Sequence, residues 1–203
     1  MTYTEREILL DRLENVNKNW DFVSKSIEIA RIAHEGQIRI SGKPYFTHLE
    51  EVANAFNDYS DKEKATCWLH DAPQKTALTL EDLITFQIPS DVTEAVEVLT
   101  PEWGIPYFDE IEKIVKVSLA RRPKIGDNMS NMDRDRMPEN YEPSRKIIDN
   151  WEVQYPLSIA FIQAVIDEKI SENATILDFI KTDHFPQDLK ADPRWKHMTS
   201  HTQ

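Results

Sequence analysis

Apolar positions recur at three- and four-residue steps along most of the chain, as at Ile27, Ala30 and Ala33. This spacing keeps one face of an α-helix apolar, and no stretch alternates cleanly enough to indicate a strand. The sequence therefore predicts an all-α fold, a helical bundle. The predicted helices lie near 4–16, 20–36, 48–58, 61–71, 80–86, 91–99, 107–121, 124–132, 144–154, 157–169 and 174–182.

Capping-box spacings mark where four of these helices should begin. In such a box, a Ser or Thr is followed three residues later by an acidic residue, and the two side chains bind each other's backbone N–H groups. The pairs are Thr4 with Glu7, Thr47 with Glu50, Ser60 with Glu63, and Thr79 with Asp82.

Gly and Pro residues interrupt the helical pattern at residues 37–47, 100–106 and 135–143. The pattern indicates a single domain over residues 1–183. Residues 184–203 form a polar tail, broken by Pro186 and Pro193, that we expect to be loosely packed.

Composition narrows the classes of function. The formal net charge of -12 over 203 residues disfavours broad nucleic-acid binding, although a few cations in a cleft could still hold a small phosphorylated ligand. No apolar run approaches membrane-spanning length, which argues against a membrane partner. Cys67 is the only cysteine, so an internal disulfide is excluded and a reducing cytoplasm is expected. Four glycines are too few to favour a Gly-rich phosphate loop.

Histidines and aspartates suggest a metal site. His48 should lie in the first turn of a helix, His70 and Asp71 end a helix with an apolar body, and Asp127 lies near the start of another. Adjacent helical residues diverge by about 100°, so His70 and Asp71 reach one ion only if the helix terminus points at it. Two imidazoles and two carboxylates suit Mn²⁺, Fe²⁺ or Zn²⁺. Taken alone, the His-Asp pair is weak evidence and more often marks an ordinary helix end.

Four segments together carry a family resemblance. Residues 33–48, AHEGQIRISGKPYFTH, resemble the first motif of RelA/SpoT-type alarmone hydrolases, H-x-x-Q-x-R-x-x-G-x-P-Y-x-x-H. The His-Asp pair follows at the family's distance, TLEDL and IPSDVTEAVEVLT resemble the next segments, and KIGDNMSNMD resembles the final motif, K-[LIV]-A-D-x-x-x-N-[ML]. The resemblance covers about residues 20–135 and implies an HD-domain phosphohydrolase of the small alarmone hydrolase type, without a synthetase domain.

The resemblance also implies roles for individual residues. The family's metal ligands fall on His48, His70, Asp71 and Asp127, and the implied ion is most simply Mn²⁺. Substrate-binding positions fall on Arg39, which would stack on the base, on Ser41, which would contact it, and on Asn131, near the sugar and phosphates. His34 matches a family histidine that does not bind the metal, which agrees with a core or loop-bracing role.

The chain departs from the family directly after the His-Asp pair. The usual Glu-Asp catalytic pair is replaced by Gln74 and Lys75, while Thr76 is retained. A glutamine cannot take a proton in the useful pH range, and a lysine of ordinary pKa is a cation rather than a base. Two lesser departures are Ile40, where many relatives have a cation, and Gly126, where alanine is usual and which we expect to be harmless.

Three functions remain open from the sequence. The first is a metal-dependent phosphohydrolase acting on (p)ppGpp or a similar nucleotide. The second is a nucleotide-binding sponge or sensor that lost turnover because Gln74 and Lys75 replace the usual acidic pair. The third is an HD nucleotidase for another nucleotide, since Arg39 could stack on several bases.

Overall fold

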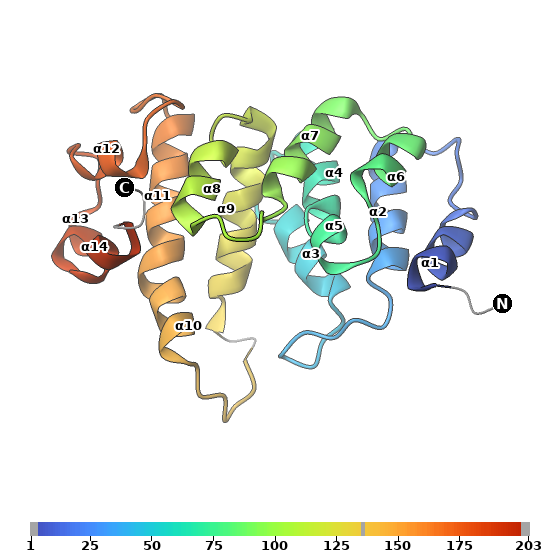
Figure 1. Ribbon diagram of the computed structural model, residues 1–203, viewed down its shortest axis with the longest axis horizontal. Helices are drawn as coiled ribbons and strands as arrows, with labels where there is room; N and C mark the ends of the chain where they lie inside the picture. Colours follow the sequence, from blue (N-terminus) through green and yellow to red (C-terminus); the bar gives the residue numbers. More distant parts are fainter. Residues whose placement is uncertain (1–3, 135–136, 200–203) are drawn as a thin grey trace.

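The structure is a computed structural model that describes residues 4–134 and 137–199. Within these ranges it contains helices and no strand, apart from one isolated bridge between Ile38 and Pro44 (Figure 1). The all-α prediction is confirmed. The elements are α1 (Glu5–Leu13), α2 (Phe22–Ala33), α3 (Phe46–Ala53), α4 (Asp61–Leu69), α5 (Ala72–Lys75), α6 (Leu80–Thr85), α7 (Ser90–Leu99), α8 (Tyr107–Ile114), α9 (Ser118–Met132), α10 (Arg145–Asp149), the π-helix η2 (Asn150–Gln154), α11 (Tyr155–Ile166), α12 (Ile176–Ile180), α13 (Gln187–Ala191) and α14 (Arg194–Thr199).

Helix α9 is the central element of the bundle. In Figure 1 the chain proceeds along the long axis from α1 and α2 on the right to α11–α14 on the left. Helix α9 lies between these ends and contacts α3, α4, α7, α8 and α11. Any side chain on its inner face therefore meets residues from both halves of the chain.

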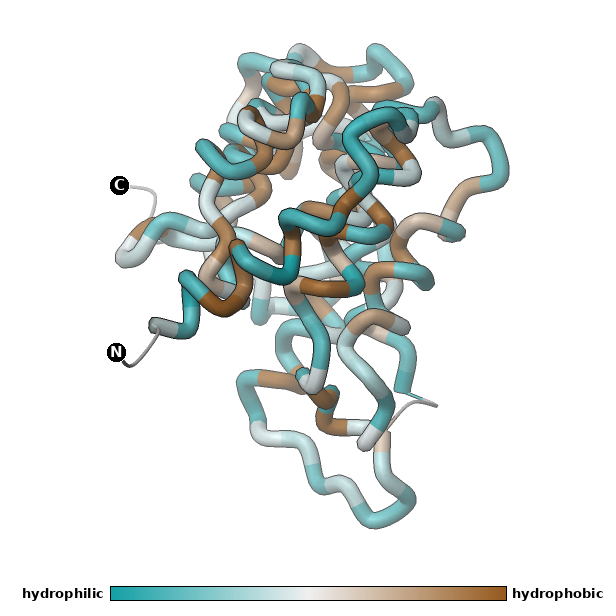
Figure 2. The backbone as a smooth tube through the Cα atoms, turned by 90° about the vertical axis from the view of Figure 1, so that its right-hand side faces the viewer, coloured by the Kyte–Doolittle hydropathy of each residue, from teal (hydrophilic) through white to brown (hydrophobic). Residues whose placement is uncertain are grey.

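Apolar side chains form the core on both sides of α9. One buried cluster includes Ile29, Leu69 and Val96, and another includes Phe108 and Phe161. Figure 2 shows hydrophobic segments gathered inside and hydrophilic ones concentrated in the outer loops. None of the described helices is long and apolar enough to cross a bilayer.

Three of the four predicted capping boxes are present, at Thr4, Ser60 and Thr79. The prediction at Thr47 is wrong, because α3 begins at Phe46 and Thr47 lies inside it. The backbone is already helical at Tyr45, and the Thr47 hydroxyl donates to the Pro44 carbonyl at 2.8 Å instead of capping.

The break between two predicted helices lies elsewhere than expected. The sequence placed it near 121–124, before Pro123, but α8 ends at Ile114 and α9 continues through Pro123 to Met132. A proline inside a helix removes one backbone hydrogen bond, and its ring crowds the carbonyl four residues earlier, at a cost of about 3 kcal/mol. The long α9 is stabilised by its buried contacts with five other helices.

The C-terminal segment is also better packed than expected. Phe185 is 1% exposed and Leu189 is buried, and both belong to the core that includes Phe161. The Phe185 ring lies 5.5 Å from that of Trp195 on α14. Loose packing was predicted because the segment is polar and is broken by Pro186 and Pro193.

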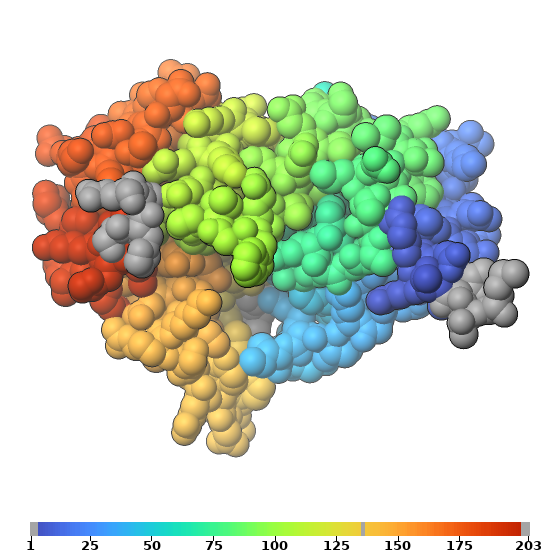
Figure 3. Space-filling model, viewed as in Figure 1, coloured from blue at the N-terminus to red at the C-terminus, as the bar shows by residue number. Residues whose placement is uncertain are grey.

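Two loops project from one edge of the molecule. They are residues 37–45, between α2 and α3, and residues 137–144, before α10, and both extend toward the lower edge in Figures 1 and 3. The first carries Arg39 and Ser41, so the loop motif lies next to the start of α3, where His48 is found.

Candidate metal centre

The chain changes direction at His70 and Asp71, and this turn brings both side chains to one place. Helix α4 ends at Leu69, and the short helix α5 begins at Ala72. His70 caps the first and Asp71 precedes the second, so their side chains are not spread around one continuous helix. His70 Nε2 lies 3.4 Å from Asp71 Oδ2.

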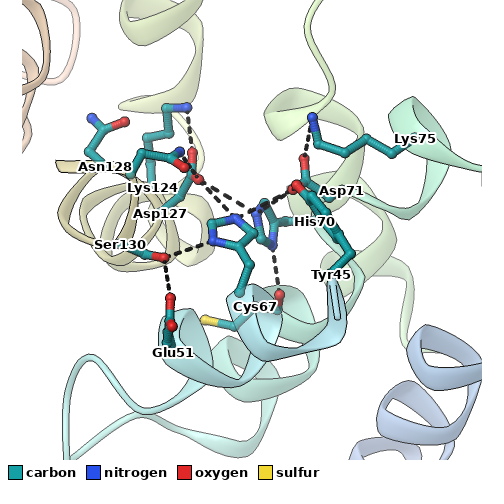
Figure 4. A network of polar contacts seen from close by, with 12 residues as sticks. Tyr45, Glu51, Cys67, His70, Asp71, Lys75, Lys124, Asp127, Asn128 and Ser130 are labelled. Carbon is teal, nitrogen blue, oxygen red and sulfur yellow. Dashed lines mark hydrogen bonds and ion pairs between the residues drawn. The ribbon is translucent and has the colours of Figure 1, made fainter. Parts of the chain in front are cut away.

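Four side chains, from α3, the turn between α4 and α5, and α9, meet at this place (Figure 4). Ligand atoms of His48, His70 and Asp71 lie within 4.8 Å of one another, and all three residues are buried. Asp127 joins them from α9, with its Oδ1 3.3 Å from His48 Nε2 and 3.8 Å from His70 Nε2. The structure thus brings together the four residues that the sequence proposed as ligands.

Hydrogen bonding orients the His70 ring. Its Nδ1 donates to the Cys67 carbonyl at 2.7 Å, because a carbonyl can only accept. Its Nε2 is buried and has no hydrogen-bond partner among the described residues. An orphaned buried nitrogen facing two carboxylates is the state expected of a metal ligand whose second nitrogen is fixed by the protein.

The His48 ring is fixed by a second chain of hydrogen bonds. Its Nδ1 lies 2.7 Å from Ser130 Oγ, and that hydroxyl donates to Glu51 Oε2 at 2.9 Å. Because a carboxylate only accepts, the serine proton points at Glu51 and its lone pairs face the imidazole. His48 therefore carries a proton on Nδ1 and directs Nε2 toward Asp71 and Asp127, where a cation would take up its lone pair.

The two carboxylates are also held in position. Tyr45 donates its hydroxyl proton to Asp71 Oδ2. Lys124 donates to Asp127 Oδ2 at 2.9 Å, and Asn131 donates to Asp127 Oδ1 at 2.7 Å. These contacts leave each carboxylate with lone pairs to spare for a cation.

The electrostatics of the cluster favour positive charge. Burial lowers the pKa of His70, but the Asp71 and Asp127 carboxylates raise it, and the resulting pKa is about 10. Burial raises the pKa of both carboxyl groups, yet His70 beside Asp71, and Lys124 beside Asp127, bring each pKa well below its usual range. In the protein alone, a proton on His70 offsets the negative charge, and a divalent ion would displace that proton.

The residues fit a divalent cation. Two neutral imidazole nitrogens and two ionised carboxylates match the preferences of Mn²⁺, Fe²⁺ and Zn²⁺. The His-His-Asp group could hold such an ion, and Asp127 lies within reach of the same space.

Gln74 and Lys75 lie on α5, immediately beside the cluster. Gln74 is exposed, whereas the Lys75 side chain leans back so that Nζ is 3.8 Å from Asp71 Oδ1 and 5.7 Å from the centre of the Tyr45 ring. At a position where the resemblance led us to expect an acid, the chain thus presents an ammonium group to a candidate metal ligand. Gln37 anchors this turn by donating to the Lys75 carbonyl at 2.7 Å.

The predicted substrate-binding residues fall at different distances from the cluster. Arg39 is largely buried and forms an ion pair with Glu51 at 2.9 Å, which links it to the cluster through Ser130. Asn131 contacts Asp127 directly. Ser41 lies in the loop and accepts from the Lys43 backbone N–H at 3.4 Å, and no contact among the described residues joins it to the cluster.

His34 lies behind Tyr45, with the two rings stacked 5.1 Å apart, and its Nδ1 is 2.8 Å from Gln37 Oε1. Burial lowers the pKa of His34, which keeps the ring neutral. This position fits the loop-bracing role that the sequence suggested.

Sequence reasoning did not identify four residues that shape the centre: Tyr45, Glu51, Lys124 and Ser130. Tyr45 is part of the quoted loop motif, and Lys124 precedes Asp127 by three residues, a spacing at which helical side chains meet. These two could have been found. Glu51 and Ser130 are 79 residues apart in the sequence, and no local pattern connects them.

Comparison with known proteins gives a distant relationship. No family model matches the chain. The chain is similar to a protein named Probable GTP pyrophosphokinase from Mycobacterium leprae (strain TN), with 28% identity over 151 residues. The match covers 69% of this chain but 19% of that protein. The chain is thus similar to about a fifth of a probable GTP pyrophosphokinase.

Proposed function

We propose that the protein is a metal-dependent phosphohydrolase that releases pyrophosphate from a (p)ppGpp-like nucleotide in the cytoplasm. The observation that carries this proposal is the buried cluster of His48, His70, Asp71 and Asp127, with His70 Nε2 left without a hydrogen-bond partner. The similarity to a probable GTP pyrophosphokinase supports a substrate from guanine nucleotide pyrophosphate metabolism. We propose Mn²⁺ as the ion.

The proposed reaction assigns a task to each side chain. When bound, a divalent ion lowers the pKa of a coordinated water and polarises a phosphoryl oxygen. In this proposal Lys75, whose ammonium group lies 3.8 Å from Asp71, would bind a phosphate oxygen. Arg39, paired with Glu51, would stack on the base.

The same Lys75 contact favours a second candidate function, that of a nucleotide-binding sponge or sensor. An ammonium 3.8 Å from Asp71 attracts an anionic ligand but cannot act as a general base. General acid–base help is worth about 10²–10⁴-fold in rate, so its loss would leave binding largely intact and turnover slow.

One assay separates these functions. The purified protein is stripped of metal, reloaded with Mn²⁺ and incubated with ppGpp, pppGpp, GTP, a deoxynucleoside triphosphate and NADPH, and the products are resolved by anion-exchange chromatography. The hydrolase proposal expects release of pyrophosphate from ppGpp or pppGpp that stops on chelation and in the Asp71→Asn variant. Hydrolysis of GTP, the deoxynucleoside triphosphate or NADPH, but not of ppGpp or pppGpp, would favour an HD nucleotidase with a different substrate.

The sponge or sensor proposal expects ppGpp binding by calorimetry without product. It also expects the double variant Gln74→Glu, Lys75→Asp to gain hydrolysis by about 10²–10⁴-fold. Both candidate functions would be refuted if the protein neither hydrolysed nor bound any nucleotide of the panel.

A further inference from the structure

Glu51 contacts both the candidate metal centre and the candidate base-binding residue. Its Oε2 accepts a hydrogen bond from Arg39 Nη1 at 2.9 Å and another from Ser130 Oγ at 2.9 Å. Ser130 in turn lies 2.7 Å from His48 Nδ1 (Figure 4). A single carboxylate oxygen thus connects a residue of the 37–45 loop with a residue of α3 and one of α9.

Burial makes these contacts stronger than those of an ordinary surface pair. The His48 and Arg39 side chains are 2% and 11% exposed, whereas Glu51 is about one-third exposed at 35%. The Ser130–His48 hydrogen bond is fully buried. A charge-assisted hydrogen bond that is shielded from water is electrostatically stronger than the same bond at an exposed position.

The direction of each hydrogen bond has a chemical result. Ser130 donates to the carboxylate, so it accepts from His48 Nδ1–H, and Nε2 is turned toward Asp71 and Asp127, where a metal ion would use its lone pair. Carboxylate-supported histidines of this kind hold a metal more tightly, and removing the support usually weakens metal binding about 10–100-fold. On the other side, the same oxygen fixes the guanidinium group of Arg39.

We propose that Glu51 is a positioning residue that serves both halves of the site, orienting His48 through Ser130 for the metal and Arg39 for the nucleotide. The nucleotide half rests on the proposed function, while the metal half does not. The inference predicts different effects for substitutions at the three partners: loss of Ser130 should weaken metal binding only, loss of Arg39 nucleotide binding only, and loss of Glu51 both.

The test measures two affinities in each variant by calorimetry: Mn²⁺ without nucleotide, and ppGpp in chelator, where no metal-dependent turnover occurs. We expect Glu51→Ala and Ser130→Ala to weaken Mn²⁺ binding about 10–100-fold. Arg39→Ala should leave Mn²⁺ binding within about twofold and weaken ppGpp binding about 5- to 150-fold, the value of one stacked base. Glu51→Ala should weaken ppGpp binding in the same direction, and Ser130→Ala should not.

Two further variants exclude simpler explanations. Glu50→Ala removes the same charge from the neighbouring, exposed position of α3 and should change neither affinity by more than about twofold. Glu51→Gln keeps an oxygen that can accept from Ser130, so it should recover part of the Mn²⁺ affinity lost in Glu51→Ala. This partial recovery separates a hydrogen-bonded relay from loss of helix structure, which circular dichroism checks in each variant.

The outcomes are distinguishable from those of the proposed function. If the unmodified protein binds no ppGpp, the proposed function fails, and the Mn²⁺ titrations still decide the relay. If Mn²⁺ affinity in Glu51→Ala stays within twofold of the unmodified protein, the inference is wrong. It is also overturned if Glu51→Ala weakens Mn²⁺ binding while Ser130→Ala does not, since a direct charge effect would then suffice.

Discussion

Replacing Lys75 by methionine removes a positive charge beside the candidate metal ligand Asp71 and keeps most of the length of the side chain. Lys75 Nζ lies 3.8 Å from Asp71 Oδ1, so the ammonium group and a divalent cation compete for the same carboxylate. We therefore expect Lys75→Met to bind Mn²⁺ more tightly than the unmodified protein.

The geometry sets the size of this effect. Two unit charges about 4 Å apart interact by about 1 kcal/mol in water and by about 4 kcal/mol at an effective dielectric constant of 20. The Lys75 side chain is 37% exposed, so the aqueous value applies. About 1 kcal/mol corresponds to about fivefold in affinity. Part of it is lost because the lysine can turn away from Asp71 when a cation binds, so the expected gain is about two- to fivefold.

The assay is a Mn²⁺ titration followed by electron paramagnetic resonance of the free ion, at low and at physiological salt. Lys190→Met is the matched control, because Lys190 is exposed on α13 near the C-terminal end of the bundle (Figure 1). It removes the same charge from the protein without touching the site. An unchanged or weaker Mn²⁺ affinity in Lys75→Met, relative to Lys190→Met, would refute the competition between ammonium and metal.

Three further predictions follow from the fold and the site. Mn²⁺ at about 100 times its dissociation constant should stabilise the fold by about 2.7 kcal/mol, which raises Tm by about 5–11 °C in calorimetry, and His70→Ala should abolish this rise; an equal rise in the variant would place the ion elsewhere. Burial raises the pKa of Asp82, but hydrogen bonds from Arg6 and from the Thr79 cap lower it by more, so the net shift is downward. The stability that the ionised carboxylate contributes is therefore present above the unfolded pKa of about 3.9 and is lost as pH falls through the lower folded pKa. In urea unfolding, Asp82→Asn should therefore be less stable than the unmodified protein near pH 6, and the gap should close at low pH; a gap that stays constant would contradict this. Phe185→Ala should cost about 3–5 kcal/mol in urea unfolding, whereas Trp103→Ala, at a fully exposed position, should stay within about 0.5 kcal/mol; similar values for the two would mean that the C-terminal segment is not part of the core.

Local signals in the sequence predicted local structure well. The boxes at Thr4, Ser60 and Thr79 work because the hydroxyl and the carboxylate that form them are three residues apart, so no distant partner is needed. Thr47 has the same spacing, but the turn after Pro44 starts the helix earlier. At that position the preceding turn determined where the helix begins.

Long-range features were predicted only where a motif carried them. The meeting of His48, His70, Asp71 and Asp127 was expected from the order of the motifs, since their spacing alone was weak evidence. The hydrogen bonds from Ser130 to Glu51 and to His48 depend on how α9 packs against α3, and neither residue is unusual for a helix surface. The burial of Phe185 likewise depends on tertiary contacts that no local pattern encodes.

Gly126 lies at a close contact between α9 and the end of α3, beside the candidate metal centre. A Cβ atom there would lie 3.0 Å from Tyr59 Oη, 3.1 Å from Ala55 Cβ and 3.3 Å from the Val52 carbonyl at the end of α3, so these neighbours would have to give by a few tenths of an ångström. Asp127 is the next residue on α9, while His48 lies on α3. The missing methyl group, which looked harmless in the sequence, therefore lies at a close contact one residue before the candidate ligand Asp127.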